Sequence, residues 1–179
     1  MSSARSLYGC TLAALLSIPL AAPLQAQIPA MVPVGTGIDT YGPATPGTGG
    51  FEPQLSAFGV PGIGNANFAL EVDDALGDTA GVLMYSPGAA NIPLGGVGFL
   101  LLGAPLYLGP IFTTSGSAGL GGVGEASLPF PLPLQPGLVG FELHFQCILA
   151  DANGAYTGGL VLTNGLRVTV QEGNLTNSL

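Results

Sequence analysis

The sequence predicts an all-β fold: an antiparallel β-sandwich of jelly-roll or Greek-key type, with about eight or nine short strands. From residue 51 onward, short apolar segments alternate with clusters of Gly, Pro, Asn and Asp. Glycine and proline account for 30 and 16 of the 179 residues, and they interrupt every candidate helix within three turns. Short strands separated by turn residues are typical of sandwiches and barrels.

Each expected strand is a short apolar segment bounded by turn residues. We expect strands at 54–59, 67–73, 80–85, 97–102, 106–113, 124–129, 139–150, 157–162 and 166–171. Residues 61–64 and 76–78 are expected to form turns, because Gly, Pro and Asp favour turn conformations. Proline cannot donate a hydrogen bond to a neighbouring strand, so Pro131, Pro133 and Pro136 predict a loop or a sheet edge.

The clearest strand lies within 139–150, where apolar and polar side chains alternate. One face carries Phe141, Leu143, Phe145, Cys147 and Leu149, and the other carries Glu142, His144 and Gln146. This alternation is typical of a sheet with one buried face and one solvent face. We therefore expect Cys147 in the core and His144 on the polar surface.

A turn signal near the end of the chain predicts a hairpin. Asn164-Gly165 is a pair that favours tight turns between antiparallel strands. A two-residue loop would pair Leu162 with Arg167, whereas a three-residue loop would pair Leu162 with Leu166. The second register gathers the apolar residues on one face, so we favour the longer loop with a bulge.

Composition divides the chain into four segments. Residues 1–26 resemble a secretory signal peptide, with Arg5 before an apolar stretch too short to span a bilayer. Residues 27–50 are rich in Pro, Gly and Thr and predict an extended arm or linker. Residues 51–172 are expected to form the β-sandwich domain, followed by a flexible tail at 173–179. The protein is thus expected to be secreted, to the cell surface, periplasm or medium, without a membrane span.

Charge argues against two classes of partner. Ten acidic residues against two Lys or Arg give a formal net charge of −8. Removal of the signal removes Arg5, which changes this charge from −8 to −9 and leaves Arg167 as the sole Lys or Arg. Nucleic acids and anionic membranes are both bound through basic residues. We therefore expect neither as a partner.

Several Gly, Pro and aromatic positions match a known pattern. Residues 41–51, Tyr-Gly-Pro-Ala-Thr-Pro-Gly-Thr-Gly-Gly-Phe, resemble a lead-in of the form Tyr-Gly-x-x-Cys-x-Gly-Ser-Gly-Gly. The match continues at 61–65, 67–76, 94–96, 138–141, 145–146 and 163–168. With these motifs, the chain resembles a family of small secreted bacterial β-sandwich proteins of unassigned activity, over most of 41–171. The resemblance implies a fold and no particular chemistry.

The resemblance also implies two cysteines that this chain lacks. Family members often carry one in the lead-in and one after the Gly-Gly near position 96. Here Ala44 or Thr45 and Val97 occupy those places. Loss of both is consistent with a dispensable disulfide between arm and sheet, of the kind that stabilises by ~2–4 kcal/mol. We therefore expect other contacts to hold the arm.

Candidate catalytic groups are few. His144 is the single histidine, so a Ser-His-Asp arrangement would have to use it, and no Gly-x-Ser-x-Gly motif is present. Cys147 is the one cysteine left after signal removal. Its apolar neighbours Phe145 and Leu149 predict an inert core thiol. We expect no enzymatic activity and assign no catalytic residue.

The acidic residues leave open whether the chain binds calcium. Asp73, Asp74 and Asp78, with Glu71 nearby, could supply oxygens to Ca²⁺, although their spacing fits no defined calcium loop. The segment 151–154, Asp-Ala-Asn-Gly, resembles the start of such a loop but lacks its later ligands. Asp and Asn are also ordinary turn formers. We expect no cofactor and assign no metal ligand.

The leading functional hypothesis is a secreted, non-enzymatic β-sandwich with a structural or interaction role at the cell exterior. It would act by packing or strand addition at a sheet edge, with copies of itself, an extracellular matrix or a polysaccharide. The alternative is a carbohydrate-binding module, in which sugars stack on aromatic rings. The candidate rings are those of Tyr41, Tyr85, Tyr107 and Tyr156. An enzyme is the third hypothesis.

Overall fold

The computed structural model describes residues 37–95, 98–156 and 158–173. The expected signal peptide, the first part of the expected arm and residues 174–179 lie outside these ranges. The described residues form eleven short strands and two 3-10 turns, η1 (Thr48–Gly50) and η2 (Pro136–Leu138). The strands are β1 (Ile38–Tyr41), β2 (Gln54–Phe58), β3 (Ala69–Leu76), β4 (Ala80–Ser86), β5 (Ala89–Pro93), β6 (Phe99–Leu102), β7 (Tyr107–Thr113), β8 (Gly121–Pro129), β9 (Glu142–Ala150), β10 (Leu160–Leu162) and β11 (Gly165–Thr169).

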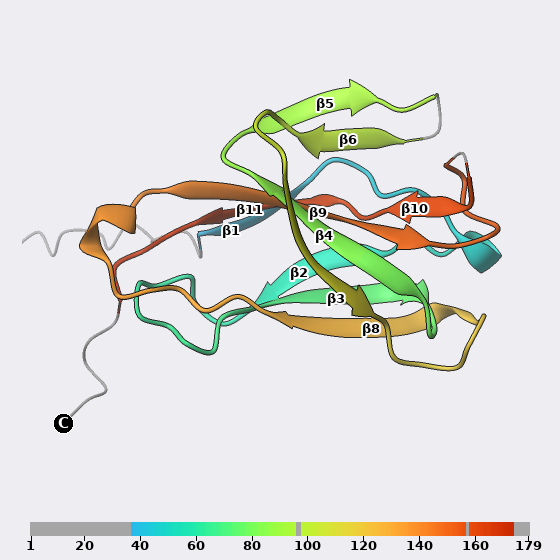
Figure 1. Cartoon of the computed structure of the whole chain (residues 1–179), viewed down its shortest axis with the longest axis horizontal. Helices are drawn as coiled ribbons and strands as arrows, with labels where there is room; N and C mark the ends of the chain where they lie inside the picture. Colours follow the sequence, from blue (N-terminus) through green and yellow to red (C-terminus); the bar gives the residue numbers. More distant parts are fainter. Residues whose placement is uncertain (1–36, 96–97, 157, 174–179) are drawn as a thin grey trace, which may run out of the picture. The chain divides into compact units, whose positions relative to one another are not determined.

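The strands assemble into two sheets and a smaller two-stranded unit. Sheet A has the order β1-β11-β9-β4-β7, and β10 also pairs with β9. Sheet B has the order β2-β3-β8, and β5 pairs with β6 to form a flap. Neighbouring strands in all three are antiparallel, which confirms the predicted fold class. Figure 1 shows the flap on one side of sheet A and sheet B on the other.

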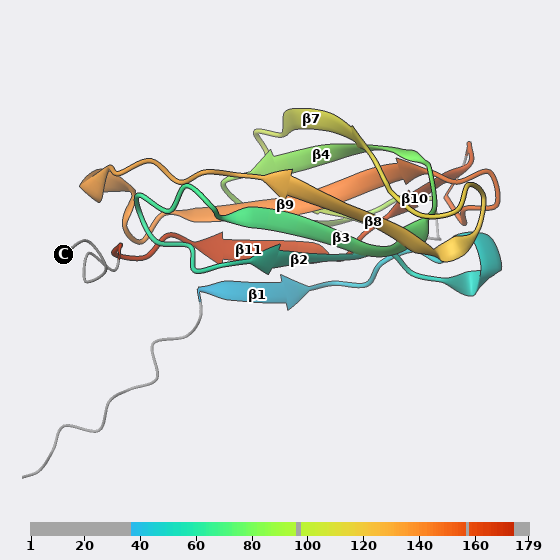
Figure 2. The same ribbon diagram turned by 90° about the horizontal axis from the view of Figure 1, so that it is seen from below.

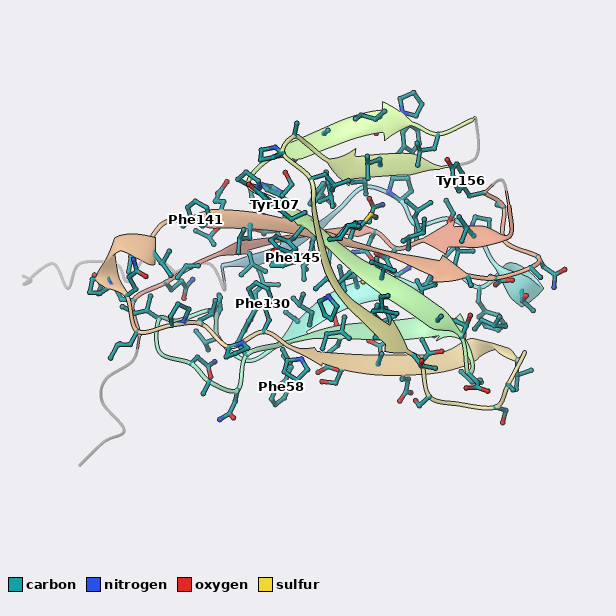
Figure 3. All side chains as sticks on the ribbon, viewed as in Figure 1. Phe58, Tyr107, Phe130, Phe141, Phe145 and Tyr156 are labelled. Carbon is teal, nitrogen blue, oxygen red and sulfur yellow. The ribbon has the colours of Figure 1, made fainter. Side chains whose placement is uncertain are left out.

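The main core lies between sheets A and B. Its buried side chains come from all three strands of sheet B and from four strands of sheet A, and include Leu55, Leu70, Leu128, Leu83, Phe145, Val161 and Leu166. Phe130 packs edge-on against Phe145, with ring centroids 5.1 Å apart, and Figure 3 shows both rings between the sheets. Burying side chains of this size contributes about 1.5–3 kcal/mol each, so this layer dominates the stability of the fold.

A second buried layer covers the face of β9 that was predicted to meet solvent. Met84, Leu102 and Leu162 form a cluster between sheet A and the flap. His144 and Gln146 are consequently 6% and 0% exposed. The solvent-face prediction was wrong because the arm and β6 cover this face. Neither β1 of the arm nor β5, which pairs with β6, was predicted from the sequence. Neither segment carries the long apolar alternation that identifies a half-buried strand.

The expected hairpin at the end of the chain does not form. β10 pairs with residues 148–150 of β9, and β11 pairs with residues 142–145 of the same strand. The two strands therefore lie end to end along β9, and the predicted pairing of Leu162 with Leu166 was wrong. Between them, the Asn164 side chain accepts the Leu55 N–H at 2.7 Å and donates to the Leu55 carbonyl at 3.0 Å. The Asn-Gly pair thus joins sheet A to β2 instead of closing a turn.

The described part of the expected arm is bound to the sheets. β1 pairs with β11 along its full length. Thr45 then forms a reciprocal contact with Leu162: its N–H donates to the Leu162 carbonyl at 2.9 Å, and its Oγ1 accepts the Leu162 N–H at 2.6 Å. A Cβ placed on Gly98 would lie 2.5 Å from Thr45 Cγ2. Thr45 therefore connects the arm to β10 and to the start of β6.

The described ranges contain no helix with the length and apolar character needed to cross a bilayer. Figure 2 shows β7 and β1 at opposite margins of sheet A, with β3 and β8 of sheet B in front of it.

Candidate functional site

The single histidine lies in a row of polar residues across the outer face of sheet A. Neighbouring register positions on four strands hold Asp39, Arg167, His144 and Ser86. The Arg167 guanidinium binds the Asp39 carboxylate at 2.8 Å. His144 instead contacts Tyr41, whose hydroxyl oxygen lies 3.2 Å from Nδ1.

The hydrogen bonds of Tyr41 assign the proton on His144. Tyr41 donates its one hydroxyl proton to the Leu101 carbonyl at 3.0 Å. A carbonyl only accepts, so Nδ1 of His144 is the donor toward the Tyr41 oxygen. Burial lowers the pKa of His144, Glu142 raises it and Arg167 lowers it. Burial also raises the pKa of Tyr41 to about 12, so both rings are neutral at pH 7.

The residues around His144 do not assemble a Ser-His-Asp arrangement. In that arrangement a carboxylate accepts a hydrogen bond from the histidine Nδ1, and Nε2 faces the serine. Here Nδ1 contacts Tyr41, and the ion pair engages the Asp39 carboxylate. Ser86 is fully buried and donates to the Gly103 carbonyl at 3.0 Å. His144 therefore holds the arm and the flap against sheet A.

Cys147 lies in the core, as its alternation with Phe145 and Leu149 predicted. Its side chain is fully buried within the main cluster and forms no disulfide. Burial raises the pKa of the Cys147 thiol. A nucleophilic cysteine needs an accessible thiolate, so this position favours a packing role.

The three acids considered for calcium occupy a bulge and a turn. Asp74 has a φ of 55° and lies where the β3–β8 register shifts, and Asp78 has a φ of 54°. Asp tolerates this left-handed conformation better than most residues. Asp73 is exposed on β3. Within the described ranges, no three His, Cys, Asp or Glu side chains gather closely enough to hold a metal ion.

Asp151 anchors the arm. Its carboxylate accepts hydrogen bonds from the Thr48 N–H at 2.7 Å, the Thr48 hydroxyl at 2.6 Å and the Asn153 N–H at 2.9 Å. Burial raises the pKa of Asp151, but these hydrogen bonds outweigh that effect, so the net shift is downward. Asn153 Nδ2 also donates to the Thr48 hydroxyl oxygen at 3.1 Å. The Asp-Ala-Asn-Gly segment thus binds η1 through its first and third residues, in place of the calcium role considered from its sequence.

We expect Asp151→Asn to destabilise the protein by about 1–3 kcal/mol at pH 7, because the amide cannot accept all three hydrogen bonds. The folded pKa is depressed, so this contribution is present above the unfolded pKa of about 3.9 and declines as pH falls toward the folded value. Denaturant titrations at neutral and acidic pH measure the difference in the free energy of unfolding between this variant and the unmodified chain. Asp73→Asn, at an exposed carboxylate, is the control. An equal loss of unfolding free energy for Asp151→Asn at both pH values would contradict the role of the ionised carboxylate.

The four tyrosines considered as sugar platforms are mostly packed. Tyr41 lies over Gly165, where an added Cβ would be 2.5 Å from its ring. Tyr85 contacts Phe145 and stacks on Tyr107, with Tyr85 and Tyr107 centroids 5.4 Å apart. Tyr156 packs against the cluster beneath the flap. Of the four, Tyr107 alone is exposed, with 47% of its surface accessible.

A group of exposed apolar side chains lies at the β7 margin of sheet A. We call it the β7 patch and define it as the exposed side chains of Leu106, Leu108 and Ile111. Leu108 and Ile111 are 71% and 77% exposed. They lie opposite Met84 and Val82, on the outer face of sheet A. Single exposed apolar residues are common, whereas several together at one margin are typical of contact surfaces.

A second exposed feature is a hollow on the outer face of sheet B. It has a volume of about 520 Å³ and is lined by residues of β2, β3, β8 and the segment before β3. Phe58 stands at its rim with 65% of its surface exposed, and Figure 3 shows this ring projecting away from Phe130 and Phe145. Asn67, Glu71 and Ser127 supply polar groups.

No family model, no curated protein and no solved structure matches this chain. The family resemblance therefore stays a prediction, and function must be argued from the surfaces themselves.

Sequence reasoning considered Glu71 only as a neighbour of the candidate calcium acids, and it did not single out the other residues of the hollow. Phe58, Glu71 and Ser127 come from three strands and meet through the registers of β2 with β3 and of β3 with β8. Period-two alternation places each residue on a face of its own strand, but it does not specify which strands are neighbours. The usable signal was Phe58 itself, an aromatic residue at the polar-face positions of its strand.

Proposed function

We propose that the chain is a secreted, non-enzymatic interaction domain that acts at the cell exterior. The observation that supports this proposal is the β7 patch, in which Leu108 and Ile111 expose 71% and 77% of their surface. Covering such side chains with an apolar partner is favourable by about 25 cal/mol per Å² of apolar area buried. A domain with 7% charged residues has few groups to keep a partner away from this surface.

The contact is expected to be made by side chains more than by strand addition. β7 is a margin strand of sheet A, but its register with β4 shifts between the partners of Val82 and Met84. Gly109 and Pro110 lie at this shift, and proline has no N–H to donate. Bulges and prolines protect sheet edges against pairing with another strand. We therefore propose that an apolar partner packs on the outer face beside β7.

A second copy of this chain is the first partner to test. Sedimentation velocity of the chain from Gln27 onward should show association that increases with concentration. Salt should strengthen it, because copies of charge −9 (the −8 of the full chain without Arg5) repel each other until screened. The double substitution Leu108→Thr with Ile111→Thr should abolish association, since threonine keeps strand propensity but removes the apolar contact.

The matched control is Leu134→Thr, at a leucine that is 67% exposed outside the β7 patch. It should associate like the unmodified chain, and all variants should keep the same circular dichroism spectrum. Monomers at every concentration and salt level, or association that survives the double substitution, would reject self-association through β7.

Carbohydrate binding is a second candidate function, favoured by the hollow on sheet B. An exposed aromatic ring beside a carboxylate, an amide and a hydroxyl is the combination that sugar recognition uses: apolar stacking together with directed hydrogen bonds.

A further inference from the structure

We infer that the outer face of sheet B binds a neutral polysaccharide, with one sugar ring on Phe58 and its hydroxyls at Glu71 and Asn67. This inference rests on the second candidate function and is independent of the β7 patch.

Two neighbouring rows of side chains build the site. The registers place Phe58, Ala69 and Pro129 in one row across sheet B. The small side chain of Ala69 lies between two larger ones, which leaves the hollow of about 520 Å³. That volume falls within the ~300–1,000 Å³ usual for small-molecule sites.

The second row supplies hydrogen bonds. Glu71 lies opposite Ser56 on one side and Ser127 on the other. The Ser127 hydroxyl donates to Glu71 Oε1 at 2.8 Å, which orients the carboxylate. A carboxylate only accepts hydrogen bonds and each sugar hydroxyl can donate, so the second oxygen of Glu71 matches this ligand. Hydrogen bonds to a charged acceptor are about twice as strong as neutral ones.

Asn67 adds an amide at the same hollow. Its backbone N–H donates to the Asn65 side chain at 2.9 Å, but within the described chain its own side chain makes no hydrogen bond. An exposed amide offers both a donor and an acceptor, which a vicinal pair of sugar hydroxyls can satisfy together.

Charge limits the ligand to neutral sugars. A neighbouring hollow shares Glu71 and Ser127 and adds Asp73 and Glu125. These carboxylates have no basic residue among them, since Arg167, the one Lys or Arg of the described chain, is paired with Asp39 on sheet A. Uronate or sulfate groups would therefore meet like charge on this face.

The experiment measures depletion of the chain from solution by four neutral polysaccharides: cellulose, xylan, chitin and a β-1,3-glucan. Alginate and pectate serve as acidic comparators. We expect saturable binding to at least one neutral polysaccharide, and weaker binding to both acidic ones. Phe58→Ala and Glu71→Gln should each weaken that binding about tenfold or more, the loss usual for a good stacking or charge-assisted contact.

Phe141→Ala and Glu142→Gln are matched controls, because both residues are exposed and lie beside or on β9 in sheet A. They should bind like the unmodified chain, and thermal midpoints should confirm that all four variants fold. The inference is overturned by absence of saturable binding to all four neutral polysaccharides, by unchanged affinity of Phe58→Ala, or by equal binding to the acidic comparators. Self-association through β7 is measured separately, so either proposal can fail without the other.

Discussion

Asn164→Leu is expected to lower the free energy of unfolding by about 2–6 kcal/mol, a large fraction of the stability of a typical domain. The Asn164 side chain accepts the Leu55 N–H and donates to the Leu55 carbonyl. Leu55 is 1% exposed, so no water replaces these bonds. Leucine would leave the N–H and the carbonyl of Leu55 unpaired, at about 1–3 kcal/mol each, and would also remove the hydrogen bond from Asn164 to the Gly165 carbonyl. Denaturant unfolding followed by circular dichroism measures the loss.

Asn91→Leu is the control for this substitution, because Asn91 is exposed on β5 and a surface change usually stays within about 0.5 kcal/mol. Asn164→Asp keeps the shape and the acceptor for the Leu55 N–H but loses the donor. It should also destabilise, and it offers a measurement if the leucine variant does not fold. A loss for Asn164→Leu no larger than for Asn91→Leu would show that the two sheets do not depend on this link.

The same residue shows why the end of the chain was predicted incorrectly. Asn-Gly pairs favour hairpin turns because both residues accept left-handed conformations. The partner of Asn164 is Leu55, 109 residues away in the chain, and a local pattern carries no information about it. Glycine is needed at position 165 for a different reason, since the Tyr41 ring lies where a Cβ would be. The Asn-Gly pair therefore resembles a hairpin turn in the sequence although no hairpin turn forms there.

The fold class was predictable because it depends on local features. Gly and Pro exclude long helices, and the alternation in β9 correctly placed Phe145, Cys147 and Leu149 in the core. The opposite face of β9 was not predictable in the same way. His144 and Gln146 are polar, yet the flap and arm bury them through specific hydrogen bonds. Polarity in a sequence indicates a need for hydrogen bonds, which solvent or protein can meet.

The candidate site also depends on contacts between distant parts of the chain, which are set by the register of neighbouring strands. The hollow on sheet B needs Phe58 beside Ala69, and Glu71 beside Ser127. Glu71 and Ser127 are 56 residues apart in the chain. A shift of one residue in either strand pair would turn these side chains to the other face. The sequence therefore supports sugar binding as a hypothesis, and the structure supplies the surface on which it can be tested.

Gln146→Leu is expected to have the second large effect, and to act on the flap more than on the sandwich. Gln146 accepts the Leu101 N–H at 3.0 Å and donates to the carbonyls of Phe99 at 3.0 Å and Thr163 at 2.9 Å. The side chain is fully buried, so leucine would leave three backbone groups unpaired. Hydrating two of them requires β6 to move away from sheet A. We therefore expect the free energy of unfolding to fall by about 2–5 kcal/mol. The opening of the flap limits this loss because it lets water reach the unpaired groups.

Hydrogen exchange distinguishes local opening from global destabilisation. In Gln146→Leu, amides of β5 and β6 should lose more protection than those of β3, which lies in the other sheet. Gln54→Leu, at an exposed glutamine on β2, should leave both regions unchanged. Equal loss of protection in β3 and β6 would mean that the flap and the sandwich unfold as one unit. Because His144 and Tyr41 also hold the flap through Leu101, adding Tyr41→Phe should increase the loss in β6 and still spare β3.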